Sequence, residues 1–208
     1  MRISSTFLTF ILTGTLALSG CQAADAAPGD GTPQEGSTQG PYLLVVNKSG
    51  NTLSVVDPQT HTELKAIPTG FAPHEVAASA DGRFAYVTDY GTGSQPGNTV
   101  TVVDLESMDV VRTISLEPHT RPHGIGVAAD GTLWVTTEGS AHVLHLDPQT
   151  GTILAAVETG QRTTHQLVIA DGDDRVVTAN IGSGNASVVQ ASGGELLGHV
   201  TTGAGAGG

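Results

Sequence analysis

The 208-residue chain is long enough for one domain or a small pair, and it carries 20 Asp and Glu against 8 Lys and Arg. Its net charge of −12 disfavours non-specific binding to nucleic acid, so we expect no nucleic-acid partner. The 28 Gly and 10 Pro indicate many turns, and no long periodic helical segment is present.

Residues 1–20 have the pattern of an export signal. Arg2 supplies the positive charge, and the apolar stretch 7–18 is too short to span a bilayer. The stretch runs into the sequence LSGC, which resembles a bacterial lipobox and contains the single cysteine of the chain, Cys21. We therefore predict lipidation at Cys21 and a membrane-anchored protein of the bacterial cell envelope, facing the periplasm or the cell surface. The alternative is an ordinary secretory signal with an incidental cysteine.

The lipidated cysteine begins a polar segment. Residues 21–40 are dominated by Gly, Pro, Ser, Thr and Gln and show no apolar periodicity. This composition is typical of a flexible tether. We expect it to connect the membrane anchor to a folded domain over residues 41–208.

The folded domain is built from repeats. Short apolar runs that end in Asp57, Asp104, Asp147 and, more weakly, Gln190 recur every 43 to 47 residues. Strand-like units of this period, separated by turn residues, are typical of four-stranded propeller blades. We place the units at about 42–70, 71–117, 118–160 and 161–203, and we expect each acidic residue to cap the turn after a third strand.

The third unit shows the scheme most clearly. Its expected strands are 123–129, 133–138, 141–146 and 152–158, rich in Val, Thr, Leu and Ile. The first strand carries only small residues on one face, which suits a strand crowded against its neighbours near a central axis. Asp130 and Gly131 predict a two-residue type I′ turn between the first two strands.

The second unit carries a recognisable motif. Tyr86-Val87-Thr88-Asp89, followed by a loop and the strand 98–104, resembles the YVTN β-propeller repeat family, and variants of the motif recur at 44–47 and 177–180. The resemblance covers about residues 42–203 and implies an all-β propeller fold. The family includes uncharacterised envelope proteins, surface-layer proteins and relatives of sugar-lactone hydrolases, so the resemblance implies little about activity.

The repeats do not close a ring. The first unit lacks its first strand, because Tyr42 already begins the second. About four blades are therefore present, whereas family members typically close with seven, and an open ring leaves unpaired strand edges. We favour a partial propeller that belongs to a seven-bladed ring; the alternatives are a strained four-bladed ring and closure by self-association.

Three histidines occupy matching places in the repeat. Each lies before a first strand, and fifteen residues later each unit has a polar residue at the end of its second strand. The pairs are His74 with Asp89, His123 with Glu138, and His165 with Asn180. Since a hairpin brings its two ends together, we expect each pair to lie side by side at the mouth of the central channel.

This set permits two interpretations. Imidazoles beside carboxylates are ligands of the zinc type, so the residues could hold a divalent metal ion or another ligand. Alternatively, the histidines fix the loops before each blade, which their repetition favours. No complete catalytic motif is present, so we favour a lipid-anchored, non-catalytic module that binds a protein, glycan or small ligand through the histidine face. The alternatives are a metal-dependent hydrolase of the lactonase type and a metal or redox-partner protein.

Overall fold

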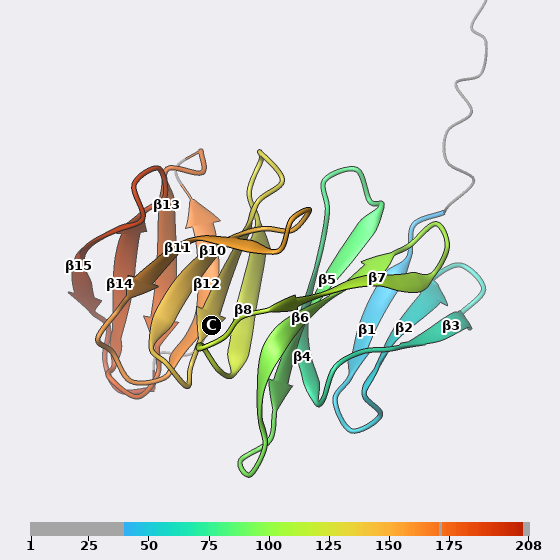
Figure 1. Ribbon diagram of the computed structural model, residues 1–208, viewed down its shortest axis with the longest axis horizontal. Coiled ribbons are helices and arrows are strands. Elements are labelled where there is room, and N and C mark those ends of the chain that lie inside the picture. Colours follow the sequence, from blue (N-terminus) through green and yellow to red (C-terminus); the bar gives the residue numbers. More distant parts are fainter. Residues whose placement is uncertain (1–39, 171, 206–208) are drawn as a thin grey trace, which may run out of the picture. The chain divides into compact units, whose positions relative to one another are not determined.

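The computed structural model describes residues 40–170 and 172–205, which form four antiparallel β-sheets (Figure 1). The predicted signal, lipidation site and most of the tether lie outside these residues. The first sheet contains β1 (Leu43–Asn47), β2 (Thr52–Asp57) and β3 (Thr62–Pro68). Within the described residues, no helix is long and apolar enough to cross a membrane.

The other three sheets have four strands each, in chain order. The second contains β4 (Pro73–Ala78), β5 (Phe84–Gly91), β6 (Pro96–Asp104) and β7 (Asp109–Ser115). The third contains β8 (Pro122–Val127), β9 (Leu133–Thr137), β10 (His142–Asp147) and β11 (Thr152–Glu158). The fourth contains β12 (Thr164–Ala170), β13 (Arg175–Asn180), β14 (Asn185–Gln190) and β15 (Glu195–Thr201). Each sheet is thus a simple meander, as the repeat predicts.

The first strands of successive sheets lie against one another. β8 contacts both β4 and β12. The first sheet has no counterpart of these strands in the described residues: β1 pairs with β2 and contacts β4 in the next sheet. The prediction that the first unit begins with its second strand is therefore confirmed.

Apolar side chains fill the three interfaces between consecutive sheets. Tyr86 and Val102 of the second sheet pack with residues of the third, whereas Val87 and Val103 pack with the first. Successive strand residues point to opposite faces, so the Val-Val pairs of the repeat serve two interfaces at once. Trp134 of the third sheet is only 1% exposed and packs toward the fourth. A sheet between two neighbours is therefore buried on both faces, which explains its continuous apolar runs.

Glycines allow the close approach of β8 and β12. A Cβ atom on Gly124 would lie 2.9 Å from the carbonyl oxygen of His165, and one on Gly126 would lie 3.1 Å from side-chain carbons of Leu167 and Ile169. The expectation of a crowded first strand with one face of small residues is confirmed.

The turns confirm one prediction and correct another. The carboxylates that end the third strands accept backbone N–H groups from the turns that follow, as when Asp147 accepts from Gln149 at 2.8 Å. The type I′ prediction is wrong. Gly131 has a positive φ of 84° but Asp130 does not, whereas a type I′ turn needs positive φ at both residues. The Asp130 carboxylate instead accepts the Thr132 N–H at 3.0 Å, which stabilises a wider turn.

Candidate functional site

The three histidines form a row across the first strands. His74, His123 and His165 are each the second residue of their strand, in β4, β8 and β12. Because β8 lies between the other two strands, the His123 ring lies between the other two rings. Its centroid is 4.0 Å from that of His74 and 3.7 Å from that of His165. Sequence reasoning therefore placed all three histidines correctly at one end of the sheets.

The same backbone irregularity positions each histidine. Ala72, Arg121 and Thr163 each lie two residues before a histidine and have positive φ values of 49°, 58° and 56°. Each first strand then has a register shift that takes the histidine and the next residue out of the regular pairing. Bulges of this kind redirect side chains and are common beside active sites. Three repetitions of one irregularity indicate that the direction of these rings is determined by the fold.

Threonine hydroxyls hold the bulges to the neighbouring sheets. The Thr88 Oγ1 atom accepts the Glu75 N–H at 3.0 Å and donates to the His123 carbonyl at 3.0 Å. Thr136 repeats this arrangement one sheet later, accepting the Gly124 N–H at 2.8 Å and donating to the His165 carbonyl. Sequence reasoning did not assign these residues a role, although a threonine stands at the same point of the second strand in the second, third and fourth units.

Glu138 connects two sheets through its carboxylate. Its Oε1 atom lies 2.5 Å from Nδ1 of His165, and its Oε2 atom accepts the Tyr90 hydroxyl at 2.5 Å. His123 is also close, since ligand atoms of His123, Glu138 and His165 all lie within 4.8 Å of one another. The predicted proximity of His123 and Glu138 is therefore observed, but the ion pair of Glu138 is with His165 in the next sheet.

Asp89 and Asn180 do not pair with their histidines as predicted. The Asp89 carboxylate accepts the hydroxyls of Thr99 and Thr101 at 2.7 and 2.8 Å, both on the third strand of its sheet. The Asn180 amide donates to Asn185 and Ser187, each at 2.8 Å, also on a third strand. These buried side chains connect the second strand to the third instead of facing a ligand.

Strand register explains why Glu138 differs. Asp89 and Asn180 lie opposite the residue before their histidine, and in the third sheet that place belongs to Thr137. The hairpin of the third sheet is one residue shorter than the other two. A count of fifteen residues from His123 therefore ends one position beyond Thr137, at Glu138. The structural counterpart of Glu138 is therefore Tyr90, and both side chains lie beside the histidines.

Burial lowers the pKa values of His123 and His74. The His123 pKa falls to about 3, chiefly because the ring is buried and also because of the nearby charges of His74, His165 and Lys48. Burial and the Lys48 charge also lower the pKa of His74. The Nδ1 atoms of His74 and His123 are buried and have no hydrogen-bond partner within the part of the chain that the structure describes. In the tautomer that carries the proton on Nε2, each Nδ1 is a buried nitrogen with a free lone pair, which is suited to binding a metal ion.

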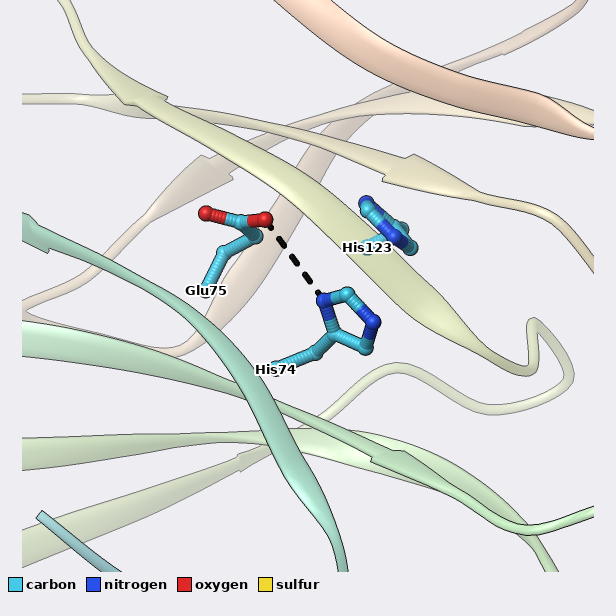
Figure 2. A group of neighbouring side chains, drawn as sticks. All are labelled: His74, Glu75 and His123. Atoms are coloured by element: carbon cyan, nitrogen blue, oxygen red, sulfur yellow. Dashed lines mark ion pairs between the residues drawn. The ribbon is translucent and has the colours of Figure 1, made fainter. Parts of the chain in front are cut away.

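Two sets of three residues could hold a metal ion. One is His74, Glu75 and His123, drawn in Figure 2; the other is His123, Glu138 and His165. Figure 2 shows Glu75 beside His74, with Oε1 3.5 Å from Nδ1, a contact too long for a strong hydrogen bond, and the His123 ring next to them. Glu75 was not predicted, because its residue type is not repeated in the other units. Its Oε1 atom also accepts the Gln166 amide at 2.9 Å, which reaches across from the fourth sheet.

The histidines open onto a cavity of about 770 Å³. Its lining includes His74, Glu75, His123, His165 and Gln166, together with residues of β13 and β14. This volume is in the range of small-molecule sites. The other histidines of the described region lie elsewhere: His145 stacks on Trp134, and His142 lies against His119. His142 and His145 therefore do not act together, as their spacing predicted.

Comparison with known proteins supports the fold. No protein-family model matches the sequence, and no curated protein is similar to it in sequence. Among solved structures, the chain is similar to hydrazine synthase of Kuenenia stuttgartiensis, with a TM-score of 0.68, 22% identity and coverage of 78% of this chain and 46% of that one. It is also similar to the periplasmic gluconolactonase PpgL of Pseudomonas aeruginosa, with a TM-score of 0.65, 22% identity and coverage of 82% and 54%.

A third similar structure is virginiamycin B lyase of Staphylococcus aureus, with a TM-score of 0.64, 13% identity and coverage of 77% and 52%. These neighbours are β-propeller proteins. The described sheets are blades of a β-propeller. The chain spans about half the length of the propeller chains it matches. At such low sequence identity, these similarities support the fold and nothing further about this chain.

Proposed function

We propose that this propeller is a ligand-binding module of the bacterial cell envelope that holds a divalent metal ion at its histidine face. The observation that carries the proposal is the pair of ligand sets that share His123. Nitrogen and carboxylate ligands of this kind suit Zn²⁺ and related ions. The low pKa of His123 favours the proposal, because no proton competes with a metal for this imidazole near neutral pH.

Metal analysis of protein purified without a histidine tag tests the proposal. We expect stoichiometric Zn²⁺ uptake by calorimetry in the wild type and a loss of at least about 100-fold in affinity in His123→Ala, because both ligand sets lose a member. His61→Asn is the matched control, since His61 is exposed and Asn tolerates its positive φ of 57°. A wild type that takes up no ion contradicts the proposal. If His123→Ala then also fails to fold, the histidines have a structural role.

Hydrolysis is a second candidate function. The fold similarity to a periplasmic gluconolactonase and the short Glu138–His165 contact favour a metal-dependent lactonase. In such an enzyme a metal held by His74, Glu75 and His123 would polarise the lactone carbonyl, and the Glu138–His165 pair, left free of the metal, would accept a proton from water. Hydrolysis of glucono-δ-lactone by the Zn²⁺-loaded protein, lost in Glu138→Gln, would favour this reading. Equal rates in the two proteins would favour a module that binds without catalysis.

We also propose that Cys21 anchors the module to a membrane. The support is the resemblance of the preceding residues to a lipobox, together with the polar segment 22–40. In a bacterial host, radiolabelled palmitate should enter the wild type and not Cys21→Ser, and the variant should leave the membrane fraction. Label in the variant, or a wild type without label, contradicts the anchor.

The resemblance to the YVTN β-propeller repeat family supports an envelope location.

Thr88 and Thr136, which follow valine at the same point of the motif, position His123 and His165 through their carbonyls. We therefore propose that the motif serves the spacing between blades, and that the residues around it determine what each protein binds.

A further inference from the structure

Positive charge gathers at the histidine face of this acidic chain. Only 8 of the 208 residues are Lys or Arg. Lys48 directly follows β1, and Arg121 directly precedes β8. Both belong to loops at the end of the sheets where the histidines lie, although they are 73 positions apart and come from different sheets.

Both charges contact the same aromatic ring. The Lys48 Nζ atom lies 4.8 Å from the centre of the Tyr90 ring, and the Arg121 Cζ atom lies 5.5 Å from it. The Tyr90 ring is itself 5.3 Å from His74 and 5.7 Å from His123. Three sheets thus place two cations at the border of the histidine row.

Neither cation is neutralised by a carboxylate. Lys65, Arg83 and Arg175 each form an ion pair with an Asp, whereas Lys48 and Arg121 form none with any residue in 40–170 or 172–205.

The nearby carboxylates have other partners. Glu138 is held by Tyr90 and His165, and Glu75 is held by Gln166. The Arg121 guanidinium donates to the Gly93 carbonyl at 3.1 Å, a neutral partner that leaves its charge available. Two uncompensated cations on a ring that contacts the histidines attract an anion more strongly than isolated surface charges do.

We propose that Lys48 and Arg121 form an anion subsite that receives the carboxylate of a small acidic ligand beside the histidines. The inference rests on the proposed function, because the metal ion would bind the other end of the same ligand. Arg presents a planar fork that matches a carboxylate, and Lys adds a mobile point charge. A small anion is the appropriate class, because the net charge of −12 repels a polyanion such as nucleic acid.

Calorimetry with malonate tests the subsite. Malonate should bind the Zn²⁺-loaded wild type, and Lys48→Gln/Arg121→Gln should weaken that binding by about tenfold or more, since two charge-assisted contacts are lost. The same double variant should retain its Zn²⁺ affinity within about threefold, since neither residue belongs to a ligand set. Metal content is measured after each titration, so that removal of the ion by malonate is not read as binding.

Lys65→Gln/Arg112→Gln is the matched control, because it makes the same change in charge at two exposed residues of outer strands. It should leave malonate binding unchanged. Equal weakening in both double variants would reduce the effect to net charge and overturn the subsite, as would no weakening in either. Arg121→Lys keeps the positive charge but removes the contacts of the guanidinium group. If this variant still binds malonate, the loss in the double variant is due to the missing charge and not to a local folding defect.

The inference and the proposed function fail separately. If the wild type takes up no Zn²⁺, the metal proposal is overturned, and inorganic phosphate replaces malonate as the probe on metal-free protein at low salt. Phosphate binding that is lost only in Lys48→Gln/Arg121→Gln would uphold the anion subsite without the metal. No binding of either probe to the wild type would overturn it.

Discussion

The second and third blades repeat one sequence scheme but use their acidic residue differently. In the second blade, Asp89 points to the third strand and accepts hydroxyls from Thr99 and Thr101. In the third, the hairpin is one residue shorter, and Glu138 reaches the histidines. Asp89 thus has a structural role, whereas Glu138, which the shorter hairpin moves by one position, lies beside His123 and His165. In a repeat protein, functional residues are best sought where equivalent hairpins differ in length.

The largest expected effect is on the free energy of unfolding and comes from Asp89 in the second blade. Asp89→Ala should lower the free energy of unfolding by about 3 kcal/mol, because the hydroxyls of buried Thr101 and half-buried Thr99 lose a charged acceptor. Urea denaturation measures this change. Asp89→Asn should cost less than about 1 kcal/mol, because Asn fills the same place in the first and fourth blades. Loss of Zn²⁺ binding in a folded Asp89→Asn variant would show that Asp89 serves the site after all.

Glu138 should show the opposite behaviour. Glu138→Gln should weaken Zn²⁺ binding by about 10- to 100-fold, because the amide is a poorer ligand and a poorer partner for His165. The free energy of unfolding should change by less than about 1 kcal/mol, because the amide can still accept the Tyr90 hydroxyl. Calorimetry and urea denaturation on the same protein separate the two effects. A Glu138→Gln variant that is destabilised but binds Zn²⁺ normally would contradict the division between the two blades.

Acid should weaken the protein through His123. The folded pKa of about 3 lies below the unfolded value of 6.5, so between these values the unfolded chain binds the additional proton. Stability is therefore fully present above about pH 6.5 and is lost as the pH falls toward 3. We expect a loss on the order of 2 kcal/mol between pH 7 and pH 5 from this group. His123→Gln should flatten the profile by that amount, and an unchanged slope in this variant would assign the acid sensitivity elsewhere.

The smallest expected effect concerns the hydroxyls between blades. Thr136→Val keeps the shape of the side chain but removes the bonds to Gly124 and His165, which should cost about 1 to 2 kcal/mol. Zn²⁺ affinity should also fall by a few-fold, because the His165 backbone is no longer fixed. Thr113→Val, at an exposed position of β7, is the control and should be near neutral. Identical Zn²⁺ affinities in the two variants would show that the hydroxyls position nothing at the site.

The fold could be predicted from the sequence, but only part of the site could. The regular spacing of Asp57, Asp104 and Asp147 predicted the blades, and the matching places of His74 and His123 predicted their convergence, because both follow from local repetition. The roles of Asp89 and Asn180 were misassigned, since a one-residue difference in hairpin length does not show in a fixed offset from the histidine.

Apart from the threonines of the motif, the residues that sequence reasoning missed differ in type from one unit to the next. Lys48 and Arg121 belong to loops of the first and third sheets, and they contact Tyr90 of β5 only because the blades pack side by side. Glu75 and Gln166 likewise meet across the strand that separates them. No spacing within one unit could have predicted these contacts. A signal was present in the charges alone, since cations are rare in this chain and Arg121 lies two residues before His123.

The threonine contacts make binding and blade packing thermodynamically linked. Each histidine carbonyl at the centre and far end of the row is held by a hydroxyl from the preceding blade, so a displaced blade also displaces an imidazole. A ligand that needs all three rings in place must then favour the docked arrangement of the second, third and fourth blades. At a concentration 100 times its Kd, such a ligand would stabilise that arrangement by about 2.7 kcal/mol. A ligand on the histidine row would then stabilise the interfaces between these blades. Loss of the ligand would first lower the stability of the packing between the blades.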